Sequence, residues 1–170
     1  MGKNCSLIAV IDNNFGIGSG GDQLAYISGD LKRFKQLTSG KPVVMGRKTF
    51  EALPKGALPN RRNIILSRNE NLIYPNSEIV GSVEDTFFLL NDVREFFVIG
   101  GGEIYKLFLP FANRIYLTHI HHSFENVDTY FPKFDIENWE LITQKEVFED
   151  PKTGLSYSFK EYIGKSIILR

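Results

Sequence analysis

Short runs of apolar and β-branched residues alternate along the chain with longer segments whose apolar positions recur at helical spacing. Strands are predicted at residues 5–11, 42–45, 63–67, 78–80, 96–99 and 114–120, and helices at 30–38, 47–53, 83–91 and 102–109. This alternation is typical of an α/β protein built on a mainly parallel sheet. Ser82, followed three residues later by Asp85, has the pattern of a helix cap with its partner and supports the helix at 83–91.

The pattern changes after about residue 135. Residues 139–148 and 155–163 alternate apolar and polar side chains around the turn-forming segment 150–154, so they predict an antiparallel hairpin at the sheet edge. The sequence contains no internal repeat, low-complexity stretch or linker. We therefore expect a single domain, residues 1–170, in which helices cover both faces of a mixed, mainly parallel sheet of about eight strands. The apolar tail at 166–170 suggests no role.

Composition narrows the class of protein. A chain of 170 residues with 42% apolar side chains suits one folded domain. Twenty Lys and Arg balance twenty Asp and Glu, so no overall field favours nucleic acid or an anionic membrane, and the apolar runs are too short to span one. The single cysteine, Cys5, lies in an apolar run and predicts a buried free thiol, a reducing compartment and hence a cytoplasmic location.

Asp30 lies on an apolar stripe of the helix predicted at 30–38. At about 100° per residue, Asp30, Phe34 and Leu37 share one face of the helix. A carboxyl group placed there loses hydration, which raises its pKa and favours a general acid. The alternative is a helix cap or first-turn acid that interacts with the helix dipole, and position alone favours this alternative.

Three predicted strand ends carry residues suited to phosphate. Gly46 precedes two cations where a strand passes into a helix, and the glycines at 100–102 would let the backbone approach a pyrophosphate. Ser67 and Arg68 close a third strand and suit a 2′-phosphate, which favours NADP over NAD. Each feature also has a purely structural explanation, a tight turn or a glycine hinge. Three such ends at one sheet edge favour a large phosphorylated ligand.

Two other groups of residues invite a functional interpretation. The glycine-rich segment 14–22 is expected to be a mobile loop that closes over a ligand, although a surface loop without consequence has the same composition. His119 and His121 would share one strand face, with His122 beside them. Because no clear third ligand accompanies them, we expect no metal and expect these histidines to bridge a strand end and a loop.

Taken together, six segments resemble the bacterial dihydrofolate reductases. They are SLIA at 6–9, DLKRFK at 30–35, MGRKT at 45–49, LPNRRN at 58–63, IGGG at 99–102 and LTH at 117–119. Their order and spacing hold from about residue 5 to residue 163. The resemblance implies a monomeric enzyme that reduces 7,8-dihydrofolate to tetrahydrofolate with NADPH for one-carbon metabolism and that also binds folate analogues. Hydride would pass to pterin C6 and a proton to N5.

The resemblance also implies a role for individual residues. Asp30 would hydrogen-bond the pterin 2-amino group and N3 and promote protonation at N5, and Thr118 would support its carboxylate, so the general-acid interpretation prevails over the cap. Arg61 would pair with the glutamate carboxylate of the substrate through bidentate geometry. The other positions that match the substrate site are Ile8, Ala9, Leu31, Phe34, Leu53, Leu58, Ile99 and Tyr105.

The positions that match cofactor contacts lie mainly at the three strand ends. They are Ala9, Ile17, Gly46, Arg47, Lys48, Thr49, Leu66, Ser67, Arg68, Ile99, Gly100, Gly101, Gly102, Glu103, Ile104 and Tyr105. The resemblance further implies a cis bond between Gly100 and Gly101 and a hydrogen bond between Asp128 and the glycine-rich segment. Glu103 is unusual after the glycines and would repel adenosine phosphates.

The chain departs from the family pattern just before Asp30. Leu24 and Ala25 stand where the family usually has Pro-Trp, and Ser28 replaces a common proline. The missing indole would alter the ordered water beside the pterin, and Tyr26 would substitute for it in part.

Two other functions are compatible with parts of the pattern. The first is an NADPH-dependent reductase of another heterocycle, as in riboflavin synthesis, which would not need Arg61 as a glutamate clamp. The second is a non-catalytic nucleotide-binding module, which would not need Asp30 and Thr118.

Overall fold

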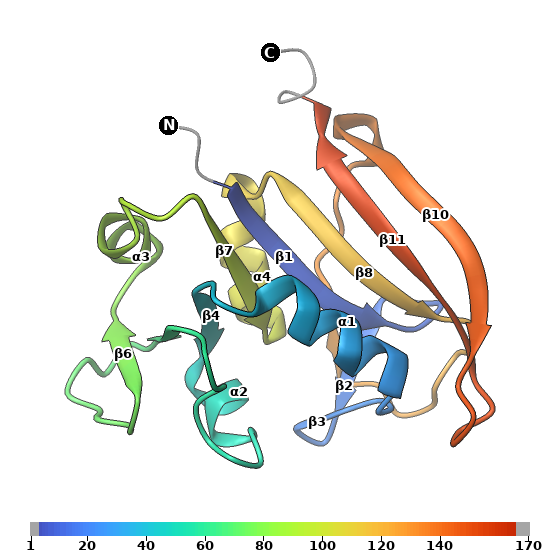
Figure 1. The fold of residues 1–170 in the computed structure, drawn as a ribbon, viewed down its shortest axis with the longest axis horizontal. Helices are drawn as coiled ribbons and strands as arrows, with labels where there is room; N and C mark the ends of the chain where they lie inside the picture. The colour runs from blue at the N-terminus through green and yellow to red at the C-terminus, as the bar shows by residue number, and fades with distance from the viewer. Residues whose placement is uncertain (1–3, 166–170) are drawn as a thin grey trace.

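A computed structural model describes residues 4–165 of the chain, and the tail at 166–170 lies outside the described residues. An eight-stranded sheet crosses the molecule in the order β10-β11-β8-β1-β7-β4-β5-β6 (Figure 1). Its strands are β1 (Asn4–Ile11), β4 (Val43–Gly46), β5 (Asn63–Leu66), β6 (Ser77–Val80), β7 (Glu95–Gly100), β8 (Arg114–Ile120), β10 (Trp139–Glu149) and β11 (Ser156–Gly164). The pairs from β8 to β6 are parallel, whereas β11 pairs antiparallel with both β8 and β10. The mixed, mainly parallel sheet and its C-terminal hairpin are confirmed.

Helices cover both faces of this sheet. They are α1 (Ser28–Thr38), α2 (Arg47–Glu51), α3 (Val83–Leu89) and α4 (Gly102–Phe108), with 3-10 turns η1 (Leu109–Phe111) and η2 (Ile136–Asn138). Figure 1 shows α1 in front of the sheet and α4 behind it. Because successive strand residues point to opposite faces, Leu7 on β1 packs in the core cluster with Phe108 of α4, while Ile8 packs in the cluster with Phe34 of α1. The three-layer architecture is therefore confirmed.

Several local expectations are also met. Ser82 caps α3, since its hydroxyl accepts a 3.0 Å hydrogen bond from the backbone amide of Asp85. Cys5 is a fully buried free thiol, and burial raises its pKa. Within residues 4–165, no helix has the length and apolar character that a membrane span requires.

The glycine-rich segment is more regular than its composition suggests. It forms β2 (Gly16–Ser19) and β3 (Asp22–Gln23), which join β9 (Thr129–Tyr130) in a small sheet of order β3-β2-β9. Asp128 fixes the turn, because its Oδ2 accepts a 2.9 Å bond from the Gly20 amide and its own amide donates to the Gly18 carbonyl at 3.1 Å. The sequence predicted a loop here and did not indicate these strands, while the expected contact with Asp128 is confirmed.

Candidate active site

Asp30 is held between helix α1 and strand β8. Its Oδ1 accepts a 2.6 Å hydrogen bond from Thr118 Oγ1. The carboxyl group is mostly buried, and burial raises its pKa, while the Thr118 bond and the charge of Arg33 act in the opposite direction. The helix begins at Ser28 with Ile27 as its N-cap residue, so Asp30 is not the helix cap but is a first-turn acid, as the second form of that alternative predicted.

Tyr105 approaches the same region from α4. The ring is buried, and its hydroxyl donates a 2.7 Å hydrogen bond to the carbonyl of Ile8 on β1. Burial and the negative charge of Asp30 both raise the pKa of Tyr105. This phenol therefore remains protonated and presents a neutral dipole near Asp30.

An apolar cluster extends from β1 along the face that carries α1. Five positions that resemble the substrate site belong to it: Ile8, Phe34, Leu53, Leu58 and Ile99. Three others lie elsewhere. Leu31 is 47% exposed, and Ala9 and Tyr105 are buried in the opposite cluster.

Arg61 lies beside Phe34 of this cluster in a fixed orientation. Its Nε donates to the Pro59 carbonyl at 2.9 Å, and its Nη1 donates to Thr38 Oγ1 at 3.0 Å. The guanidinium carbon is 5.9 Å from the centre of the Phe34 ring. No carboxylate among residues 4–165 forms an ion pair with Arg61. The positive charge is thus oriented by neutral partners, which suits it to an incoming carboxylate.

The glycine turns lie side by side, as the sequence predicts for ends of parallel strands. Gly46 ends β4 and precedes α2, and Gly101 follows β7 and precedes α4. The two strands pair, and the peptide bond between Gly100 and Gly101 is cis, as the resemblance implied. A Cβ atom on Gly46 would lie 3.0 Å from Ile104 Cγ1, so a side chain there would crowd the start of α4.

The third strand end completes this edge. Leu66 of β5 pairs with Gly46, and Ser67 follows it with its hydroxyl accepting a 3.1 Å bond from the Asn69 amide. Ile17 of the small sheet reaches the start of α4, 4.0 Å from where a Cβ atom on Gly102 would lie. Thr49 is partly buried beside Gly101. Four charged positions of the predicted cofactor set are exposed: Arg47, Lys48, Arg68 and Glu103.

The residues at this edge fit an NADP group. Glycines without Cβ atoms, helix starts with free amides and exposed cations meet there, which are the features that phosphates require. Arg47 also forms a 3.5 Å ion pair with Glu51 one helical turn away.

The histidines form a contact between a strand end and a loop, as expected. The rings of His119 and His121 stack with their centroids 4.6 Å apart. His119 Nε2 lies 2.8 Å from Asn13 Oδ1 in the turn after β1, and His121 Nε2 lies 2.9 Å from Ser158 Oγ. Within the part of the chain that the structure describes, no group of three or more His, Cys, Asp or Glu residues is placed to hold a metal ion.

The region that departs from the family pattern contains a contact that the sequence did not indicate. Ser28 donates from its amide and its hydroxyl to Asp150 Oδ1, at 3.4 and 3.3 Å, so the turn between β10 and β11 anchors the start of α1. Ala25 packs against the cluster formed by Ile27, Ile120 and Tyr157. Tyr26 is 52% exposed, and its hydroxyl donates to the carboxylate of Asp22 on β3, a contact that directs it toward the small sheet.

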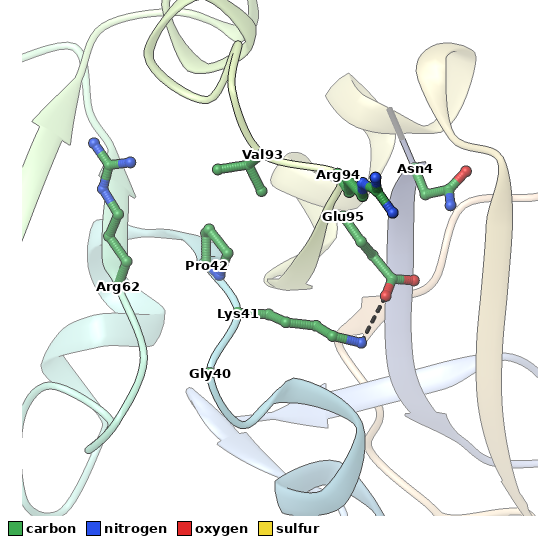
Figure 2. Close-up of a pocket in the computed structure, with 8 residues that line it drawn as sticks. All are labelled: Asn4, Gly40, Lys41, Pro42, Arg62, Val93, Arg94 and Glu95. Carbon is green, nitrogen blue, oxygen red and sulfur yellow. Dashed lines mark hydrogen bonds and ion pairs between the residues drawn. The ribbon is translucent and has the colours of Figure 1, made fainter. Parts of the chain in front are cut away.

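A separate cavity of about 530 Å³ lies at the amino ends of β1, β4 and β7 (Figure 2). The 2.7 Å ion pair between Lys41 and Glu95 crosses its wall. Because Asp30 and the glycine turns lie elsewhere, this cavity is distinct from the candidate site.

The fold and the site define an α/β enzyme in which a sheet edge suited to a nucleotide cofactor lies in the same domain as the mostly buried Asp30 carboxylate. The chain belongs to the dihydrofolate reductase family, because residues 4–163 match the family model described as "Dihydrofolate reductase".

Its relatives agree with this assignment. The dihydrofolate reductase of Bacillus subtilis is 38% identical over 161 residues, covering 95% of each chain, and that of Staphylococcus haemolyticus is 38% identical over 157 residues, covering 92% of this chain and 93% of the relative. Among solved structures, the dihydrofolate reductase from Enterococcus faecalis complexed with NADP(H) and RAB-propyl matches with a TM-score of 0.88 and 29% identity, covering 95% of this chain and 96% of that one.

Proposed function

We propose that this protein catalyses the NADPH-dependent reduction of 7,8-dihydrofolate to 5,6,7,8-tetrahydrofolate. Membership of the dihydrofolate reductase family supports the reaction, and the NADP(H) complex of the Enterococcus relative supports the cofactor. The observation that carries the proposal is the mostly buried Asp30 carboxylate, which Thr118 holds, together with the apolar cluster that includes Phe34 and with Arg61, whose guanidinium carbon is 5.9 Å from the centre of the Phe34 ring.

In this proposal Asp30 orients the pterin and governs its proton. The carboxylate accepts hydrogen bonds from the 2-amino group and N3, and its raised proton affinity promotes protonation at N5. Thr118 fixes the carboxylate through Oδ1, and among residues 4–165 no side-chain hydrogen bond engages Oδ2. NADPH, when bound, supplies the hydride that passes to pterin C6.

The apolar cluster accounts for the rest of the substrate. The side chains of Ile8, Phe34 and Ile99 contact the rings, Leu53 and Leu58 form the wall beside the benzoyl group, and the exposed Leu31 covers them. Arg61 then receives the glutamate carboxylate through its remaining N–H donors. Folate analogues with the same ring and carboxylate would bind in the same way.

The strand-end residues bind the cofactor. Gly46, Gly101 and Gly102 admit the phosphates to the starts of α2 and α4, and Ser67 with Arg68 takes the 2′-phosphate. Ala9 and Tyr105 line the nicotinamide side. The remaining members of this set are Ile17, Arg47, Lys48, Thr49, Leu66, Ile99, Gly100, Glu103 and Ile104.

We further propose that the chain forms one domain over residues 1–170 and acts as a cytoplasmic monomer. One continuous sheet supports the single domain, and the buried free thiol of Cys5 supports a reducing compartment.

The decisive experiment follows the loss of NADPH absorbance with dihydrofolate as the substrate. The proposal predicts turnover, and Asp30→Asn is expected to lose it at neutral pH and to recover it as the pH falls. Binding of NADPH without turnover would instead identify a nucleotide-binding module, and activity confined to another heterocycle would identify a different reductase. A larger thermal shift with NADPH than with NADH checks the cofactor choice.

A further inference from the structure

Arg33 lies one helical turn after Asp30 on α1 and is held by aromatic rings. Its guanidinium carbon is 4.3 Å from the centre of the Phe159 ring and 5.7 Å from that of Tyr116. The side chain is partly buried, so these contacts limit its freedom to swing into solvent. Arg33 therefore presents a positive charge at a defined place.

The register of the sheet brings this charge to the site. Thr118 on β8 and Phe159 on β11 are direct partners across the antiparallel pair. Thr118 donates its hydrogen bond to Asp30, and the ring of Phe159 contacts the guanidinium of Arg33. Asp30 and Arg33 are three residues apart and lie on the same side of α1. The Asp30 carboxylate therefore contacts β8 and the Arg33 guanidinium contacts β11 at residues that are direct partners in the sheet.

Arg33 also interacts with a second carboxylate. Glu161 on β11 is the partner of Tyr116 on β8, and the charges of Glu161 and Asp30 both favour the protonated guanidinium against its burial. Arg114 Nη1 lies 3.8 Å from Glu161 Oε1. Arg33 thus interacts electrostatically both with Asp30 in the candidate site and with Glu161 outside it.

The other titratable groups around Asp30 are neutral or already engaged. Burial and the charge of Asp30 raise the pKa of Tyr105 on α4, and burial and the charges of Asp150 and Asp30 raise the pKa of Tyr157 on β11. Burial raises the pKa of Tyr116 to about 12. Asp150, near Tyr157, is engaged with Thr153 and Ser28, and the Thr153 bonds hold its pKa below the ordinary value. Arg33 is consequently the cation that acts on Asp30.

We propose that Arg33 is an electrostatic positioning residue of the reductase, which favours the ionised carboxylate of Asp30 and so sets the pH above which hydride transfer slows. This inference rests on the proposed function, and it assigns Arg33 a role beyond packing. Burial alone would favour the neutral form of Asp30, and the positive charge of the Arg33 guanidinium opposes this effect. The charge acts through Asp30, since Arg33 itself rests on Phe159.

The test is the pH profile of the single-turnover hydride-transfer rate with NADPH and dihydrofolate. Arg33→Met keeps a long apolar stem on Phe159 but removes the charge. We expect the midpoint of its profile to move to higher pH and the rate above the midpoint, relative to the acid plateau, to increase by roughly two- to fivefold. Arg33→Lys keeps the charge and is expected to retain the parental midpoint.

Two further variants separate the local charge from other effects. Lys35→Met removes the same charge from an exposed position on α1, so its profile should coincide with that of the parent. Glu161→Gln removes the competing carboxylate and is expected to move the midpoint the opposite way, to lower pH, because Arg33 then acts on Asp30 alone. If Arg33→Met does not fold, this opposite shift decides the matter.

The outcomes distinguish this inference from the function on which it rests. Absence of dihydrofolate turnover in the parent enzyme would overturn the proposed function itself. Turnover with a pH-dependent rate whose midpoint is the same in the parent, Arg33→Met and Glu161→Gln would leave the function intact and overturn the role of Arg33. An equal shift in Lys35→Met would also overturn it, because the effect would then belong to net charge.

Discussion

Replacing Thr118 by valine removes a single hydroxyl group from the candidate site without changing the shape of the side chain. Thr118 is 3% exposed, and its hydroxyl donates the 2.6 Å hydrogen bond to Asp30 Oδ1. A buried hydrogen bond to a charged group contributes about 1.5–3 kcal/mol, against about 0.5–1.5 kcal/mol for a neutral pair. We therefore expect Thr118→Val to lower the free energy of unfolding at neutral pH by about 1.5–3 kcal/mol.

The size of this effect should depend on pH in a defined direction. The Thr118 bond favours the ionised carboxylate, so its loss raises the pKa of Asp30 further in the folded protein. The destabilisation is complete at pH values where Asp30 is ionised in both proteins. It shrinks as the pH falls through the folded pKa of the variant and then through that of the parent, because a protonated acid loses less with the hydroxyl.

Urea unfolding of parent and variant across this pH range measures the effect. Thr118→Ser retains the hydroxyl but removes the methyl group, and it serves as the control for packing. A difference between Thr118→Val and parent that stays constant with pH, or that grows as the pH falls, would refute the reasoning. A serine variant with the same pH dependence as the valine variant would also refute it.

Three further predictions concern stability and substrate affinity. Asp30→Asn should be more stable than the parent by about 1 kcal/mol at neutral pH, because the folded pKa of Asp30 lies above its ordinary value of 3.8. The ionised carboxylate therefore destabilises the folded parent increasingly as the pH rises through this range. Urea unfolding should show that the difference between variant and parent disappears in acid. Arg61→Lys should raise KM for dihydrofolate about tenfold with little change in kcat, since an ammonium cannot make two parallel bonds to a carboxylate; steady-state kinetics would contradict this if KM were unchanged. Gly29→Ala should destabilise the fold by about 1–3 kcal/mol because its Cβ would overlap the Tyr157 hydroxyl, and Tyr157→Phe in the same chain should restore part of the loss in thermal unfolding.

The main sheet could be predicted from the sequence because its strands are apolar on one or both faces. The small sheet could not, since β9 contains only two residues and its partner β2 is a glycine-rich segment more than a hundred residues earlier. Its pairing depends on backbone groups and on Asp128, which carry no periodic signal. Composition marked the segment at 14–22 as a glycine-rich loop, but it did not indicate that the segment would form strands or what those strands would pair with.

The candidate site was predictable to different degrees. The helical stripe indicated that Asp30 would face the sheet, but a helix pattern does not show which strand it meets, so Thr118 followed only from the family resemblance. The start of α1 was missed by two residues, since Asp150 anchors it from another part of the chain. Arg33 shows a signal that could have been used, because a cation three residues after an acid lies on the same helical face.

The anchoring of α1 has a consequence for synthesis on the ribosome. The helix that carries Asp30 is made early, yet the residues that fix it, Thr118 and Asp150, are translated some ninety and one hundred and twenty residues later. A nascent chain that has not yet emerged through β8 therefore has the acid but neither anchor, and one that has emerged through β8 but not through the β10–β11 turn has only Thr118. Substrate binding should consequently appear only late in translation, once both anchors are present.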